Sequence, residues 1–146
     1  MQKSSQDTFE YEDLAALYRV EKKAPSLSAV RRDLYPGMAK LLRELNAEYT
    51  KQISLDPDSL ICEGINQRRK KAKQLAKEVI ELRMQKICSL ALRGAMGAQN
   101  IIEPLTAEEK EYYNEVLNTS KRHASILTHL SGERKYESVR IDEVPA

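Results

Sequence analysis

Residues 59–93 read SLICEGINQRRKKAKQLAKEVIELRMQKICSLALR and contain no proline and a single glycine, Gly64. Apolar side chains recur through this stretch mostly at steps of three and four residues, which is the spacing of one face of an α-helix. They are Ile61, Ile65, Ala72, Leu75, Val79, Leu82, Ile87 and Leu90. At about 1.5 Å per residue this helix would be roughly 50 Å long. That is more than a compact domain of 146 residues needs, so we expect part of the helix to pack against a surface outside the compact domain.

Two shorter helical segments precede the long one. Residues 10–23 place leucines and tyrosines on one helical face, and Pro25 ends this segment because proline disfavours helical geometry at the residue before it. Asp33 is a suitable N-cap for a second amphipathic helix that runs to about residue 53. The stretch LDPDS breaks that helix. Asp58 is then placed to cap the long helix.

A fourth helix follows the glycines of GAMGAQ, which favour a helix end. Thr106 and Glu109 have the spacing of a capping box, and Gly132 suits the left-handed residue that closes a helix. We expect its inner face to consist of Tyr113, Val116, Leu117, Ser120, Ala124, Leu127 and Leu130. The sequence therefore predicts an all-α helical bundle with one long central helix over residues 1–132.

Length and composition narrow the class of protein. A chain of 146 residues can form one domain with its own core, and its formal charge of +2 gives no general signal for nucleic acid or acidic membrane. No apolar run approaches the ~18 residues that a membrane span needs. The N-terminus MQKSSQDTFE lacks the apolar segment of a signal peptide. We expect a cytoplasmic protein without a membrane partner.

Residues suited to catalysis or metal binding are sparse. His123 and His129 would be turned roughly 240° from each other on the fourth helix, so they do not share a face. Cys62 and Cys88 would lie roughly 39 Å apart along the long helix, beyond disulfide reach. Phosphate-loop, zinc-protease and nucleophile-elbow motifs are absent from the sequence. We expect no catalytic residue, metal or cofactor; a small metal- or thiol-dependent enzyme is the weakest alternative.

Charged residues cluster at two places in the sequence. Glu108, Glu109 and Glu111 fall in the first turns of the fourth helix, where carboxylates interact favourably with the helix dipole, and this suffices to explain them. The second cluster is a run of five basic residues in the long helix. It spreads over more than half of the helix circumference, which is typical of a solvated face. Contact with nucleic-acid phosphates is the alternative, and it would define a helical nucleic-acid-binding module. The run consists of Arg68, Arg69, Lys70, Lys71 and Lys73.

Some apolar positions could serve either the core or a partner subunit. Leu75, Val79 and Leu82 lie on the stripe of the long helix, and Tyr113 and Leu117 lie on the stripe of the fourth. The long helix and its well-striped neighbours exceed what one protomer can cover. We therefore expect an oligomer, most simply a tetramer, with these five residues at a subunit interface or in the core.

Three stretches, in this order along the chain, resemble archaeal subunits of the GINS complex. Residues 7–45 resemble the opening of those subunits: a short helix ending in charged residues, a proline connector, and an Asp-aromatic start to an amphipathic helix. Residues 81–92, ELRMQKICSLAL, resemble the family's long-helix signature, and residues 105–109 resemble its Leu-Thr-x-Glu-Glu opening. Ala24 stands where serine is more usual, and Leu34 where phenylalanine is common. The matching positions of the first two stretches are Arg19, Glu21, Lys22, Lys23, Pro25, Leu27, Asp33, Leu34, Tyr35, Arg83, Lys86, Ile87 and Ala91.

This resemblance implies a scaffold and not an enzyme. GINS is a homotetramer or heterotetramer of related subunits that joins the MCM helicase and a RecJ-like protein in the replicative helicase assembly. The resemblance therefore implies other GINS subunits, MCM helicase and the RecJ-like protein as partners, and a location in the nucleoid-associated replication machinery of the cytoplasm.

The resemblance also gives an expectation for the last residues of the chain. In one class of GINS subunit a helical domain is followed by a small β domain, and SVRIDEVP at residues 138–145 looks like the start of that domain. On this interpretation residues 1–132 are the helical (A-type) domain. Residues 133–146 are then a strand-like linker or the start of a missing β (B-type) domain.

Overall fold

The computed structural model describes residues 8–130 and 132, except for the side chain of Thr128. This part of the chain forms four helices, α1 (Tyr11–Lys23), α2 (Leu34–Leu55), α3 (Leu60–Ala95) and α4 (Ala107–Leu130). The predicted all-α fold with one long helix is confirmed. None of these four helices is both long and apolar enough to cross a membrane. The predicted linker at residues 133–146 lies outside the described residues.

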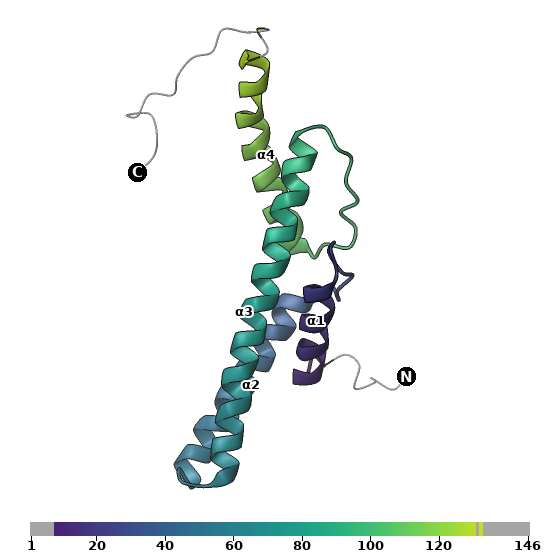
Figure 1. Ribbon diagram of the computed structural model, residues 1–146. Coiled ribbons are helices and arrows are strands. Elements are labelled where there is room, and N and C mark those ends of the chain that lie inside the picture. The colour runs from purple at the N-terminus through teal and green to yellow at the C-terminus, as the bar shows by residue number, and fades with distance from the viewer. Residues whose placement is uncertain (1–7, 131, 133–146) are drawn as a thin grey trace, which may run out of the picture.

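The long helix α3 is the axis on which the other three helices pack (Figure 1). α1 and α2 lie against its first half, and α2 runs antiparallel to it because the two are joined by a short turn. α4 runs in the same direction as α3, since residues 96–106 carry the chain back to the middle of α3 first (Figure 1). As a result α4 continues past the end of α3.

Local hydrogen bonds explain where the helices begin and end. Ser59, and not the expected Asp58, caps α3: its Oγ accepts a 3.0 Å hydrogen bond from the backbone N–H of Cys62. At the other end the N–H of Ala98 donates to Arg93 O at 3.0 Å, and the N–H of Gly97 donates to Gly94 O at 3.1 Å. With the φ of +102° at Gly97, these bonds form a Schellman motif. The predicted stop is confirmed.

The remaining caps follow the sequence in part. Thr106 and Glu109 form the predicted capping box, with reciprocal side-chain to backbone bonds of 3.0 and 3.2 Å. Asp33 stands at the N-cap of α2 but makes no cap hydrogen bond; its carboxylate accepts from the Arg31 guanidinium, at 2.9 Å to Nη2. Gly132 has the expected positive φ, +85°.

Two apolar clusters form the core of the described residues. The first joins α1, α2 and the middle of α3, with Leu14, Leu34 and Val79 fully buried at its centre. The second joins the last part of α3 to the return loop and α4, through Ile87, Ala91, Leu105 and Tyr113. Leu27 and Val30 of the first connector pack against these clusters, as expected.

A glycine lets α4 and the return loop approach α3 closely. A Cβ atom placed on Gly94 would lie 2.8 Å from Asn100 Nδ2, 3.0 Å from the Tyr113 hydroxyl and 3.1 Å from Leu117 Cδ1. Asn100 Nδ2 donates to Leu90 O and to the Tyr113 hydroxyl, both at 2.9 Å. The small residue therefore leaves room for the hydrogen bonds that hold the loop.

Candidate functional site

Buried charged side chains gather at the middle of α3, between the two apolar clusters. Arg83 of α3 and Glu21 of α1 are fully buried, and Glu109 of α4 is 2% exposed. Such burial is rare for arginine and glutamate unless they are paired. Residues of every helix and of the first connector take part. We call these residues the Arg83 cluster: Glu21, Ser28, Tyr35, Arg83, Lys86 and Glu109.

One side of the Arg83 guanidinium is occupied by Glu109. Arg83 Nε donates to Glu109 Oε2 at 2.6 Å and Nη2 donates to Oε1 at 2.9 Å, a two-pronged pairing that fixes both planes. The Tyr35 hydroxyl of α2 donates to the same carboxylate at 2.8 Å. Glu109 also accepts the backbone N–H of Thr106. The carboxylate that caps α4 is thus also the counter-ion of the Arg83 guanidinium in α3.

The other side of Arg83 faces Glu21. Arg83 Nη1 donates to Glu21 Oε1, and to Ser28 O at 3.0 Å. Lys86 Nζ donates to Glu21 Oε2 at 2.6 Å and to Glu21 O at 2.7 Å. The Ser28 hydroxyl donates to Glu21 Oε1 at 2.9 Å. One carboxylate therefore joins α1, the first connector and α3.

The two buried carboxyl groups stay ionised. Burial alone raises the pKa of Glu21, but hydrogen bonds from Lys86, Arg83 and Ser28 outweigh it and bring the pKa below its ordinary value. At Glu109 burial is likewise outweighed, by bonds from Arg83, Thr106 and Tyr35, and the pKa is again lowered. Burial, together with the Glu109 carboxylate, raises the pKa of the Tyr35 hydroxyl, which remains a donor.

This arrangement suits a structural role. Two cations face two carboxylates, and each charge is held by an opposite charge and by further hydrogen bonds. The desolvation cost of burying charges largely cancels their attraction, so pairs of this kind add little net stability. The Arg83 cluster sets where α1, α2 and α4 sit along α3.

Sequence reasoning did not find this cluster as a site. The helix dipole explains Glu109 only in part, because its carboxylate also pairs with Arg83. A signal was present: Arg83 follows Val79 by one turn and precedes Ile87 by one turn, so it occupies a position of the apolar stripe. A charge at such a position must find a buried partner.

The basic run does not form one surface. Arg68 turns toward α1, where Nη2 lies 3.0 Å from Glu12 Oε1 and the guanidinium lies 4.6 Å from the ring centroid of Tyr11. Arg69 turns toward α2 and stacks 4.6 Å from the ring centroid of Tyr49. Arg68 and Arg69 thus face different helices, and phosphate contact by the run stays a prediction. Lys70, Lys71 and Lys73 are exposed.

The residues expected at an interface or in the core have different environments. Leu75 and Val79 belong to the first apolar cluster, and Tyr113 to the second. Leu117 is half-buried against the second cluster. Leu82 is half-buried on the side of α3 that faces Tyr18 and Lys22 of α1. Within this chain four of the five expected residues pack in or against the core: Leu75, Val79, Tyr113 and Leu117.

Several large apolar side chains are exposed at the two ends of the molecule. Leu127 and Leu130, expected on the inner face of α4, are 57% and 72% exposed, because α4 has passed the end of α3 there. Ile61, expected in the α3 stripe, is 67% exposed near the α2–α3 turn. The other members of these two groups are Ile126, Leu92 and Met96 at the α3–α4 end, and Ile53, Leu55 and Leu60 at the turn.

Metal-ligating and thiol groups do not converge in the described part. Residues 8–130 and 132 contain no group of three or more histidine, cysteine or acidic side chains placed to hold a metal ion. Cys62 and Cys88 are both free thiols, as predicted from their separation. Cys88 Sγ lies 2.8 Å from the Tyr112 hydroxyl.

Comparisons with protein-family models, with curated proteins and with solved structures find no match for this chain.

Proposed function

We propose that this chain is a non-catalytic scaffold subunit of a GINS complex, which links the MCM helicase to a RecJ-like partner in DNA replication. The observation that carries the proposal is the apolar end of α4. Leu127 and Leu130 belong to the last turns of α4, which runs past the end of α3 (Figure 1), and both side chains are more than half exposed. Exposed apolar side chains gathered in this way are typical of protein–protein contact sites.

The positions of the resemblance give a second line of support. Glu21 and Tyr35 come from the first similar stretch, Arg83 and Lys86 from the second, and Glu109 from the third. All five belong to the Arg83 cluster. Residues that are far apart in the sequence thus serve one structural purpose, holding the helices at fixed positions. A fixed arrangement of helical faces is what a scaffold needs to keep its partners in register.

The mass of the protein in solution tests the assembly. We expect light scattering at micromolar concentration to give an oligomer, most simply a tetramer, whether alone or after mixing with other subunits of the complex. A monodisperse monomer of 16.7 kDa under both conditions would exclude the proposal.

Binding of the helicase and of the RecJ-like protein is the second measurement. The assembled protein should retain both purified partners together on a size-exclusion column, since a scaffold must hold them simultaneously. An oligomer that binds neither partner would leave the assembly intact but contradict the replication role.

A further inference from the structure

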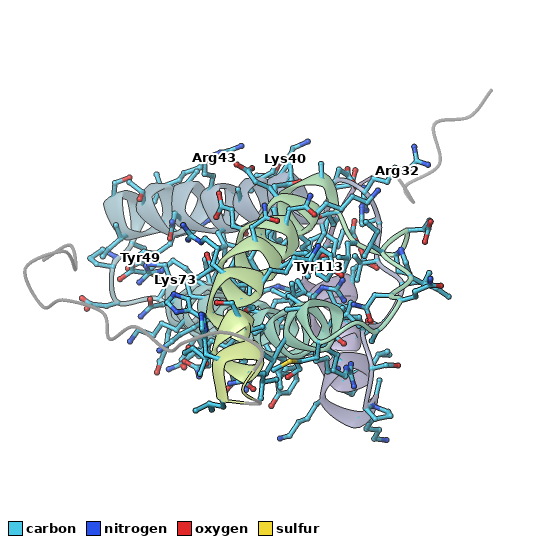
Figure 2. All side chains as sticks on the ribbon, turned by 90° about the horizontal axis from the view of Figure 1, so that it is seen from above. Arg32, Lys40, Arg43, Tyr49, Lys73 and Tyr113 are labelled. Carbon is cyan, nitrogen blue, oxygen red and sulfur yellow. The ribbon has the colours of Figure 1, made fainter. Side chains whose placement is uncertain are left out.

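The side of the α2–α3 pair away from α1 carries exposed positive charge. Six basic residues lie there, and we call them the basic seam: Lys40, Arg43, Arg69, Lys70, Lys73 and Lys77. All but Arg69 are exposed to solvent. Figure 2 shows Lys40 and Arg43 on the outer edge of α2, with Lys73 near Tyr49.

The contact of Arg69 with α2 fixes how the two rows of charge are aligned. Arg69 Nη2 donates to Asn66 Oδ1 at 2.8 Å, and Nη1 approaches Asn46 Oδ1 at 3.4 Å. The helices are antiparallel, so one turn back along α2 and one turn forward along α3 lead in the same direction. Arg43 and Lys73 therefore follow next to the α2–α3 contact, and Lys40 and Lys77 follow one turn later. Successive side chains turn outward, by about 60° per step on α2 and about 40° per step on α3.

Acidic side chains of the same helices face the other way. Glu44 and Glu48 of α2 border a hollow shared with Glu12 and Arg68, on the α1 side. Glu78 and Glu81 of α3 border a hollow shared with Tyr18 and Lys22 of α1. These carboxylates lie toward α1, where Arg68 also turns, whereas Arg43, Lys70 and Lys73 are exposed and none of them borders either hollow.

The positive charges of the basic seam are weakly compensated. Within the described part of the chain, Arg43, Arg69, Lys70 and Lys73 form no ion pair with a carboxylate. Lys40 and Lys77 have i,i+4 pairs at 3.9 Å with Glu44 and Glu81. All four of these side chains are more than half exposed, and such surface pairs contribute little.

From this geometry we infer that the basic seam binds the phosphodiester backbone of nucleic acid. The rows from Arg69 to Lys77 extend over eight residues, or about 12 Å of helix, which corresponds to roughly three to four phosphates of one duplex strand at ~3.4 Å each. Lysine and arginine side chains on rigid helices contact phosphates without reading sequence. This contact does not depend on the proposed assembly.

The direct test compares two variants with equal loss of charge. The seam variant carries Arg43→Gln, Lys70→Gln and Lys73→Gln. The control variant carries Arg19→Gln, Lys22→Gln and Lys23→Gln, which are exposed positions of α1. Fluorescence anisotropy with a labelled 20-base-pair duplex and with a single strand of the same length is measured between 50 and 200 mM salt.

We expect the full chain to bind at least one of the two DNAs with strong salt dependence. The seam variant should bind more than about tenfold more weakly at 0.1 M salt, with a duplex salt slope lower by about 3, one for each lost phosphate contact. The control variant should retain its affinity within about threefold, since nonspecific attraction depends on net charge but phosphate contacts depend on position.

Three results would overturn the inference. The first is a full chain that binds neither DNA at 50 mM salt. The second is an equal loss in both variants, which would show a general effect of net charge. The third is stronger displacement of the labelled DNA by polyglutamate than by unlabelled DNA at equal charge concentration, which would favour an acidic protein as the ligand. Circular dichroism confirms that both variants are folded.

Discussion

Arg83 occupies a position of α3 where the pattern calls for an apolar side chain, and its neighbours explain why it can be charged there. The carboxylates of Glu21 and Glu109 hold it from two sides, and all three side chains are buried. The pairing of Arg83 with the two carboxylates offsets the free-energy cost of burying these charges only while all three groups are present. The cluster is therefore sensitive to the loss of any one charge.

Replacing Arg83 with methionine should be severely destabilising. Two buried carboxylates would face each other without the guanidinium, and losing one partner of a buried ion pair costs about 3 to 5 kcal/mol. Urea unfolding followed by circular dichroism measures the change. Lys77→Met, at an exposed i,i+4 pair, is the control and should change the unfolding free energy by less than about 1 kcal/mol. Similar effects of the two changes would contradict the structural role of Arg83.

Acid should weaken the fold through the same carboxylates. Because folding lowers the pKa of Glu21 and Glu109, their contribution is complete above the unfolded-state pKa of about 4.3 and is lost as the pH falls through the folded-state values. We expect the unfolding free energy to fall steeply below about pH 4.3. Glu109→Gln should make this fall shallower than in the unchanged protein, whereas Glu44→Gln, at the surface, should not. Identical acid profiles for all three proteins would be the contrary result.

At the scale of the helices, close approach depends on single small residues. Gly94 and Gly64 both lie in α3, but only Gly94 has neighbours within 4 Å of an added Cβ. Gly94→Ala should push Asn100 and Tyr113 away and destabilise the protein by about 1 to 3 kcal/mol. Gly64→Ala should stabilise it by up to about 1 kcal/mol, since alanine is the better helix former. Thermal melts of the two variants should shift in opposite directions, and equal shifts would mean that Gly94 is not a packing requirement.

The positions of the helices could be predicted from the sequence because residues near the helix ends give a local signal. The ends of α1, the capping box of α4 and the glycine stop of α3 depend on residues within one turn. Burial was harder to predict. The stripe containing Leu127 shows that α4 has an apolar face, but periodicity does not say whether another helix reaches far enough to cover it.

The apolar stripe signals that Arg83 is buried, but its partners could not be predicted from the sequence, for a related reason. Glu21, Arg83 and Glu109 are separated by tens of residues, and their pairing follows from how α1 and α4 dock on α3. In the same way, Arg68 and Arg69 are adjacent in sequence but face different helices. The angle of 100° between neighbouring helix residues separates them. The basic seam instead combines residues of two helices.

At the scale of the whole molecule, the apolar end of α4 should govern assembly. Leu127→Glu would place a charge in the proposed contact, and the oligomer should dissociate while the helical content remains. Ser125→Glu adds the same charge at the same level of α4 but about 200° around the helix, and should leave the mass unchanged. Light scattering measures the mass of the oligomer, and circular dichroism measures the helical content. An oligomer that survives Leu127→Glu would place the subunit contact elsewhere.

Because α1, α2 and α4 all meet α3 at one buried group of charges, the molecule should open as a single cooperative unit around that point. Amide protons of α3 near Arg83 should then exchange with solvent only through global unfolding. Those in the last turns of α4, where Ile126, Leu127 and Leu130 are exposed, should exchange through local opening. Hydrogen–deuterium exchange of the isolated chain should show this gradient along α4. Formation of the proposed assembly should slow exchange specifically at its far end.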